Sequence, residues 1–255
     1  MPLTGHHPRL LVLLLLGLLC TVSPDTSARP TPTGVPHDGA LLDGFALPLE
    51  GHGYHVLHTV RDRGTHYATA ELAALIGRVA RVLMVAMPGP PLVIGDCSGH
   101  AGGLIPRHRS HQNGRDVDIL FPVVDAAGTS AAPTAFRRFG SDGRCRAKGC
   151  ALRFDEARAW WIVRTLMISQ EPAVQQVFVS NGLRKRLLQF GRSHGEHSVI
   201  LYRAERLLRQ PKGAAPHDDH FHVRVFCPPK SRAPHCKNVG RNLSWVHDGR
   251  AAAIR

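Results

Sequence analysis

Aromatic and acidic residues are both scarce in this sequence, and their scarcity argues against several classes of protein. Only 6% of the 255 residues are aromatic, which leaves few rings for the base stacking used by proteins that bind single-stranded nucleic acids. The 19 acidic residues are outnumbered by 32 Lys and Arg, but these basic residues are scattered along the chain. Despite the basic triplet at residues 184–186, we therefore expect no nucleic-acid partner.

Apart from one short segment, the sequence lacks long hydrophobic runs. Residues 10–19 are almost entirely leucine, yet this run is too short to span a bilayer and is typical of the core of a signal peptide. We expect residues 1–28 to be a signal peptide cleaved after Ala28, with a periplasmic mature chain that has no stable membrane span. The alternatives are an uncleaved anchor and a lipoprotein modified at Cys20, although Leu19 replaces the small residue that such a site requires.

Cysteine is sparse as well, and no Cys-x-x-Cys pair occurs. A structural zinc site built on thiolates is therefore disfavoured. In an oxidising compartment, the close pairs Cys145/Cys150 and Cys227/Cys236 predict two short disulfide loops. Cys97 is then left without a partner.

No internal repeat is visible, and 43% of the residues are hydrophobic, so we expect one folded domain. Residues 29–40 read as a Pro-rich linker, 41–240 as the domain and 241–255 as a C-terminal tail. Hydrophobic periodicity predicts helices at residues 72–86, 183–191 and 198–209, and a further helix that begins after Asp155 as its N-cap. It predicts strands at residues 92–95, 117–121, 174–180 and 221–227. Residues 123–153 are expected to form a loop. This irregular alternation favours an α+β fold over a doubly wound sheet.

Histidine, in contrast, is abundant, with 17 residues, and two clusters carry the chemistry. The first cluster includes His111 and Asp118, and the second includes His220 and His222, which share a strand face because they are two residues apart. If the two strands are neighbours, His111, Asp118 and His222 supply three ligands and leave a fourth position for water. An open three-ligand set is typical of catalytic zinc.

The residues around this ligand set have less certain roles. Asp116 is expected to support the ligands or the fold, and Asp218 and Asp219 either orient imidazoles or are solvated. His100, in a Gly-rich loop, is either a bystander or part of the site. We expect most other histidines, including His37, to be surface groups.

The sequence lacks a His-Glu-x-x-His motif, so no glutamate is supplied at the usual place to take a proton from water. A histidine must do so instead. We expect His220 to be the general base, with His217 as a second base or as a hydrogen-bond donor to the oxyanion. The sequence leaves these two roles open. His108, three residues before His111, is expected at the rim of the site.

These two clusters resemble those of the penicillin-insensitive murein endopeptidases, which belong to a wider group with lysostaphin, the D-Ala-D-Ala metallopeptidases and the hedgehog signalling domain. The resemblance rests on residues 110–118 and 217–224 and on Cys227-Pro228, and it covers residues 94–236. It implies a small central antiparallel sheet flanked by helices. The active-site residues that it implies are His111, Asp118 and His222 as Zn²⁺ ligands, with His220, His217 and His108 beside them.

The resemblance also implies an activity, the hydrolysis of D-alanyl to meso-diaminopimelate cross-links in periplasmic peptidoglycan. A formal charge of +13 is consistent with attraction to this anionic wall polymer. Two alternatives stay open, a D,D-carboxypeptidase or dipeptidase acting on stem peptides and a non-catalytic, metal-containing wall-binding module. A purely structural metal site would not need His217 and His220, which argues against the second.

Overall fold

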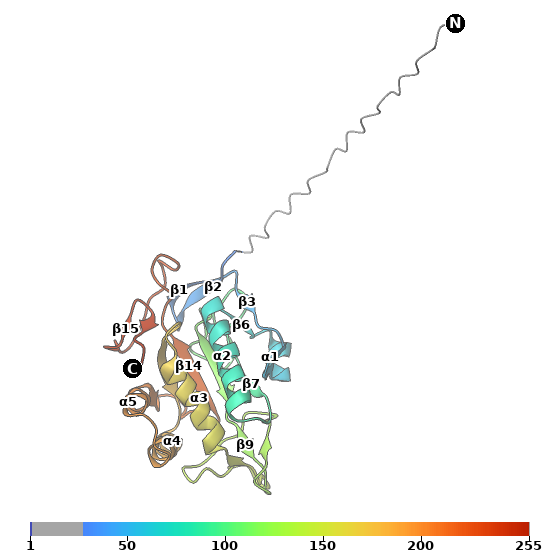
Figure 1. Ribbon diagram of the computed structural model, residues 1–255, viewed down its shortest axis with the longest axis vertical. Coiled ribbons are helices and arrows are strands. Elements are labelled where there is room, and N and C mark those ends of the chain that lie inside the picture. Colours follow the sequence, from blue (N-terminus) through green and yellow to red (C-terminus); the bar gives the residue numbers. More distant parts are fainter. Residues whose placement is uncertain (2–27, 255) are drawn as a thin grey trace.

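The computed structural model describes Met1 and residues 28–254, so all of the predicted signal peptide except its first and last residues lies outside the described residues. The fold is built on a seven-stranded sheet, with helices α2 and α3 lying side by side over one face (Figure 1). In order across this sheet, the strands are β13 (Leu208–Arg209), β12 (Val174–Phe178), β14 (His220–Val225), β8 (Asp116–Leu120), β7 (Leu92–Ile94), β5 (Tyr54–Val56) and β4 (Glu50–Gly51). The helices are α1 (His58–Arg63), α2 (Ala70–Ala86), α3 (Glu156–Ile168), α4 (Asn181–Ser193) and α5 (Ser198–Leu207).

The centre of the sheet is antiparallel, and one parallel pair of strands lies on each side of it, while the edge strand β4 pairs antiparallel with β5. Strands β12, β14, β8 and β7 pair antiparallel, whereas β5 pairs with β7, and β13 with β12, in parallel. The predicted α+β class is therefore confirmed. The expected small antiparallel sheet describes only the four central strands of a larger mixed sheet.

The predicted helices form where the periodicity places them, except that the last two residues of the helix predicted at 198–209 belong to strand β13. Helix α2 begins after Thr69, whose hydroxyl accepts a hydrogen bond from the amide of Leu72. Its buried face carries the apolar residues that predicted it, and it ends just before Pro88. Helix α3 begins after Asp155, which caps it as predicted by accepting a hydrogen bond from the amide of Arg158.

The prediction of a Pro-rich linker at residues 29–40 is wrong. Strands β1 (Thr31–Val35) and β2 (Asp38–Leu42) form an antiparallel hairpin. It is fastened to the domain because the amide of Gly34 donates a hydrogen bond to the carbonyl of His235. Pro32 is accommodated because β1 is an edge strand, where a missing N–H breaks no ladder.

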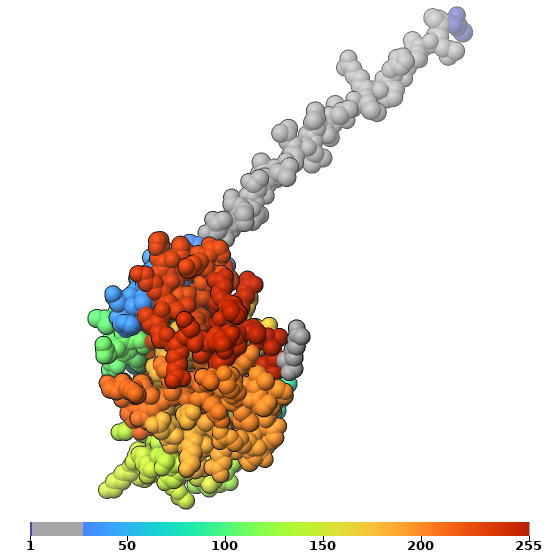
Figure 2. Space-filling model, turned by 90° about the vertical axis from the view of Figure 1, so that its left-hand side faces the viewer, coloured from blue at the N-terminus to red at the C-terminus, as the bar shows by residue number. Residues whose placement is uncertain are grey.

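The C-terminal segment is not a free tail either. Strands β15 (Val246–His247) and β16 (Arg250–Ala251) pair with each other, and Leu243 is buried in the core. Figure 2 shows this segment, in red, packed against the body of the molecule. The structure therefore continues past the boundary predicted at residue 240. That boundary is wrong because a few apolar residues within this mostly polar segment, such as Leu243, pack into the core.

The remaining connections contain further short strands. Strands β3 (Phe45–Ala46) and β6 (Tyr67–Ala68) pair with each other. The predicted loop at 123–153 holds β9 (Val123–Val124), β10 (Ser130–Ala131) and the start of β11 (Arg153–Phe154). Both predicted disulfides, Cys145–Cys150 and Cys227–Cys236, are present, and Cys97 is a buried free thiol. Within residues 28–254, no helix combines the length and hydrophobicity needed to cross a membrane.

Candidate metal centre

Strands β8 and β14 are neighbours, as the hypothesis of a shared site requires. Their register pairs Asp118 with His222 and Asp116 with Arg224, so these four polar side chains lie on one face of the sheet. The alternate residues, such as Val117 and Val223, are apolar and belong to the hydrophobic core. The alternation therefore places charge on one face and core packing on the other.

His111 approaches this face from the loop that precedes β8. Its own backbone has φ 70°, a left-handed conformation that is unusual for a residue other than glycine. Gly114, also left-handed at φ 70°, completes the turn into β8. The amide of His111 donates a hydrogen bond to Oδ2 of Asp116, 2.9 Å away, which fixes this turn against the strand. Strained backbone of this kind is common at functional sites.

Three side-chain atoms converge at one point. His111 Nε2 lies 3.3 Å from Asp118 Oδ1, His222 Nδ1 lies 3.2 Å from the same oxygen, and the two nitrogens are 3.1 Å apart. Ligands held about 2.0–2.1 Å from a tetrahedral zinc ion are about 3.3 Å apart. The spacing of these three atoms therefore fits a small tetrahedral metal ion.

The bonding of Asp118 also fits a cation. Its side chain is fully buried, and among the described residues neither carboxylate oxygen has a hydrogen-bond partner of normal geometry. A buried carboxylate without hydrogen bonds costs free energy that a bound cation would remove. Gly95 leaves room for this side chain, because a Cβ atom there would lie 3.1 Å from the Cβ of Asp118.

Each imidazole of this group is oriented by an outer partner. His111 Nδ1 lies 2.6 Å from the carbonyl oxygen of Cys97 and donates to it, so Nε2 presents its lone pair to the centre. His222 Nε2 faces Asp116 Oδ1 at 3.3 Å without a hydrogen bond of normal geometry, and Nδ1 faces the centre. Asp116 is itself held by Arg224. Such partners fix the tautomer of a metal-binding histidine.

His220 lies beside this group. Its Nε2 atom is 3.3 Å from Asp118 Oδ1, and its Nδ1 atom is 2.6 Å from Asp219 Oδ1. Burial lowers the pKa of His220, but the carboxylates of Asp118 and Asp219 outweigh it and raise this pKa to about 10. A cation bound at Asp118 would offset that negative charge and lower the pKa again.

His217 differs from His220 in its charge. Burial and the neighbouring imidazoles of His222 and His220 lower the pKa of His217 to about 4, so this ring is neutral at physiological pH. Its Nδ1 atom lies 2.9 Å from the carbonyl oxygen of Ala215 and donates to it. Nε2 of the neutral ring is therefore an acceptor.

His108 completes the group from the other side. Its Nδ1 atom is 3.7 Å from Asp118 Oδ2, and its ring is 4.5 Å from that of His111. All six predicted site residues thus come together. Two other sets of potential ligands also fall within 4.8 Å, namely His108, His111 and Asp118, and His217, His220 and His222. The predicted set takes members of both and has its three ligand atoms within 3.3 Å of one another.

These histidines open onto a cavity of about 820 Å³, which we call the histidine cleft. His108, His217, His220 and His222 line it, as does the exposed His37. Arg107 and Arg109 flank His108 at its edge and, within the described residues, make no ion pair. The cleft is therefore suited to a substrate that carries a carboxylate.

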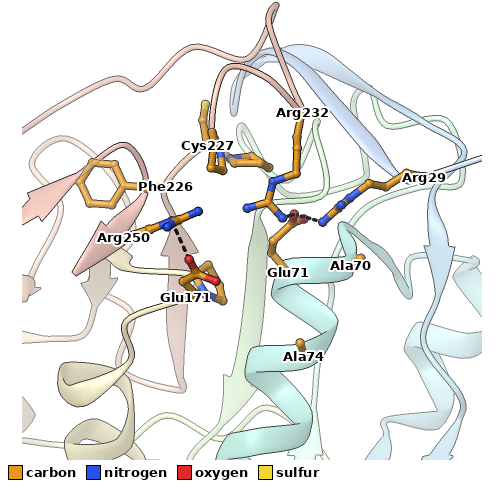
Figure 3. Close-up of a pocket in the computed structure, with 13 residues that line it drawn as sticks. Arg29, Ala70, Glu71, Ala74, Glu171, Phe226, Cys227, Arg232 and Arg250 are labelled. Carbon is orange, nitrogen blue, oxygen red and sulfur yellow. Dashed lines mark hydrogen bonds and ion pairs between the residues drawn. The ribbon is translucent and has the colours of Figure 1, made fainter. Parts of the chain in front are cut away.

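A second cavity, of about 210 Å³, lies at the start of α2 (Figure 3). Glu71 holds Arg29 at 2.8 Å and Arg232 at 3.3 Å there, and Arg250 pairs with Glu171. No histidine lines this cavity. The two pairs of Glu71 join Arg29 and Arg232 to α2, and the pair of Arg250 joins the C-terminal segment to the loop after α3. The groups suited to catalysis are in the histidine cleft.

Sequence reasoning missed one residue of the site and left another open. Asp96 lies two residues after the end of β7 and contacts His108 at 3.3 Å, and an acidic residue soon after a buried strand was the available signal. Asp219, for which two roles were open, orients an imidazole. His100 packs its ring against Tyr67 and does not line the histidine cleft.

Comparison with known proteins gives a consistent result. Residues 32–243 match the family model described as penicillin-insensitive murein endopeptidase. A protein of that name from Haemophilus influenzae is 28% identical over 84% of this chain and 69% of its own length. Proteins of the same name from Klebsiella pneumoniae and Escherichia coli are each 27% identical, over 75% and 76% of this chain and 64% and 65% of their own lengths. The chain thus spans about two thirds of the length of these relatives.

Proposed function

Because this chain belongs to the penicillin-insensitive murein endopeptidase family, we propose that it is a zinc metallopeptidase that hydrolyses peptide cross-links of peptidoglycan. The substrate bond is of the D-alanyl to meso-diaminopimelate type, and the place of action is the periplasm. The proposal includes a fold of the hedgehog and D-Ala-D-Ala peptidase type, and the removal of residues 1–28 as a signal peptide.

The observation that carries this proposal is the convergence of His111 Nε2, Asp118 Oδ1 and His222 Nδ1 within 3.3 Å of one another. These three residues would hold the metal. Two nitrogen ligands and one oxygen ligand favour zinc among the common divalent ions. Zinc, when bound, supplies Lewis-acid activation of a water molecule and of a peptide carbonyl. The cleft beside the triad leaves room for both.

His220 is the general base in this proposal. Its Nδ1–H is directed at Asp219, so Nε2 presents a lone pair to the site and can accept a proton from the attacking water. Asp219 stabilises the imidazolium that results, as the carboxylate does in other acid–base dyads. The ring packs edge-on against Phe136, which shields one side of it from solvent, while its other edge faces the histidine cleft.

His217 has a different part. Because its Nδ1–H donates to Ala215, Nε2 has no proton to give to an oxyanion. The sequence left two roles open for His217, a second base and a hydrogen-bond donor to the oxyanion. This tautomer favours the first, because Nε2 can accept a proton or a hydrogen bond from a substrate N–H. The left-handed backbone of His217, with φ 54°, directs the ring into the cleft lining.

The test of this proposal is product analysis. The zinc-loaded protein is incubated with purified sacculi and with monomeric muropeptides, with and without a chelator. We expect cross-linked dimers to fall to monomers, and this activity to stop on chelation and return with zinc. Shortened monomers would instead indicate a carboxypeptidase. An unchanged muropeptide profile would leave a wall-binding module as the better description.

A further inference from the structure

We propose that Asp96 is a positioning residue that holds the imidazole of His108 in the histidine cleft. This role rests on the proposed function, because His108 matters only if the cleft is catalytic. Asp96 follows β7, and its backbone carbonyl accepts a hydrogen bond from the amide of Asp118, 2.9 Å away. Asp96 and Asp118 are therefore neighbours through their backbones, and the side chain of His108 contacts the carboxyl groups of both.

The contact between Asp96 and His108 is directional. Oδ2 of Asp96 lies 3.3 Å from Nε2 of His108, on the opposite side of the ring from the Nδ1 atom that lies 3.7 Å from Asp118. A carboxylate only accepts hydrogen bonds, so Nε2 must carry the proton. In the neutral ring, Nδ1 then presents its lone pair toward the cleft and Asp118. Asp96 thus selects both the orientation and the tautomer of His108.

Asp96 is in turn held rigidly. Its side chain is 6% exposed, and Arg63 donates to both of its oxygens, at 2.8 and 2.7 Å. The hydroxyl of Thr65 donates to Oδ1. Arg63 is the last residue of α1, and Gly64 in a left-handed conformation turns the chain so that Thr65 also reaches the carboxylate. The end of this helix therefore serves to fix one carboxylate behind one histidine.

Electrostatics supports the same arrangement. Burial alone would raise the pKa of Asp96, but hydrogen bonds from His108, Arg63 and Thr65 outweigh it and lower that pKa. The group is therefore an anion at neutral pH, which strengthens the hydrogen bond to Nε2–H. His108 itself is 18% exposed and lines the histidine cleft, so its other edge is free to meet substrate.

The experiment compares Asp96→Ala with the conservative Asp96→Asn, each alone and combined with His108→Ala. We expect Asp96→Ala to lower kcat on cross-linked muropeptides by about 10- to 100-fold, the usual range for outer partners of active-site groups. Asp96→Asn should recover part of this loss, because an amide oxygen still accepts from Nε2–H. Zinc content should be unchanged in both variants, because the three proposed ligands are intact.

The double variant separates positioning from general stability. Asp96→Ala should cause no further loss once His108 is alanine. If the two losses multiply, or if Asp96→Ala releases zinc, the inference is overturned. Arg63→Gln, on a half-exposed helix end, gives a milder version if Asp96→Ala does not fold, with a smaller loss that also disappears in the His108→Ala background.

A readout independent of activity distinguishes this inference from the proposed function. Long-range proton–nitrogen NMR spectra of the zinc-loaded protein should show a protonated Nε2 on His108, and this signal should be lost in Asp96→Ala. If the wild-type protein cleaves no cross-link and this signal is present, the proposed function fails and the placement of His108 stands. If Nδ1 is instead the protonated atom, the positioning role is wrong.

Discussion

His111 and His222 are 111 residues apart in the sequence, yet His111 Nε2 lies 3.1 Å from His222 Nδ1. A hydrogen bond between the two neutral rings does not explain this contact. The N–H of His111 donates to the carbonyl oxygen of Cys97, and Nε2 of His222 faces Asp116, so the lone pairs of both rings point to the same place. A cation between them and Asp118 would account for this arrangement.

The first prediction separates metal binding from proton transfer. His222→Ala should abolish zinc binding, because the two remaining ligand atoms cannot hold the ion tightly. His220→Ala should keep zinc but lose about 100-fold or more in turnover, as is typical when a general base is removed. Zinc content by mass spectrometry and turnover on muropeptide dimers measure the two effects.

The control for that comparison is His194→Ala, which removes an exposed histidine just after α4 whose ring stacks on Phe190. It should change neither zinc content nor turnover. A zinc-loaded His220→Ala variant that turns over like the wild type would remove His220 from the mechanism. His217 would then be the next candidate for the base.

The second prediction concerns Arg107 and Arg109 at the edge of the histidine cleft. Arg109→Gln should raise KM for a substrate with a free carboxylate about 10-fold and change kcat little, because it removes binding that is equal in ground and transition states. Arg107→Gln should have a similar effect. Arg138, which already pairs with Asp218 at 2.9 Å, is the matched control and should have a smaller effect on KM.

The same charge should appear in the salt dependence of sacculus binding. If the +13 surplus attracts the wall polymer, binding should weaken as ionic strength rises from about 0.01 to 1 M, because screening shortens the reach of exposed charges. Binding that is insensitive to salt would contradict this interpretation.

A second substrate tests the role of Arg109. If Arg109 recognises a carboxylate, Arg109→Gln should not change the KM for an amidated substrate.

The third prediction follows from the lowered pKa of Asp96. A carboxyl group whose pKa is lower in the folded state than in the unfolded state stabilises the folded state. This contribution is fully present when the pH is above the ordinary pKa of 3.8, and it is lost as the pH falls through the folded-state pKa. Asp96→Asn should therefore be less stable than the wild type at neutral pH, by about 1–3 kcal/mol. The gap should close in acid.

Urea unfolding of both proteins at pH 7 and at several lower values tests this. A gap in the free energy of unfolding that stays constant down to pH 2 would mean that Asp96 acts through packing and not through its charge. Asp38→Asn, an exposed carboxyl on β2, is a suitable control and should leave stability nearly unchanged at neutral pH.

The fourth prediction compares the two disulfides. The Cys227–Cys236 disulfide closes a loop that follows β14 in the sequence, with a sequence separation of 9. Just after this loop, the carbonyl of Lys237 and the side-chain oxygen of Asn238 accept hydrogen bonds from the buried Arg115. Replacing both cysteines by serine should cost about 2–3 kcal/mol of stability. The same change at Cys145 and Cys150, which have a sequence separation of 5 and lie in an exposed loop, should cost less. Thermal unfolding with and without reductant measures both, and equal losses would show that Arg115 is held independently of the bridge.

Much of the fold could be predicted from the sequence because its longer elements carry their own signals. Helix α2 has a complete apolar face and a proline after its end, and α3 has an aspartate cap. The short elements carry no such signal. Hairpin β1–β2 has three prolines in or beside its first strand, and its place depends on the hydrogen bond between Gly34 and His235, a contact between distant parts of the chain.

The sequence by itself determined which residue types could bind a metal and that His220 and His222 share a strand face, because a period of two is a local property of a strand. Only the tertiary structure decided that β14 pairs with β8 in the register that sets His222 opposite Asp118. It also decided which nitrogen of each ring faces the centre, because outer partners such as Cys97 and Asp96 come from other segments. Long-range strand pairing and burial fix these relationships, and neither is encoded in local spacing.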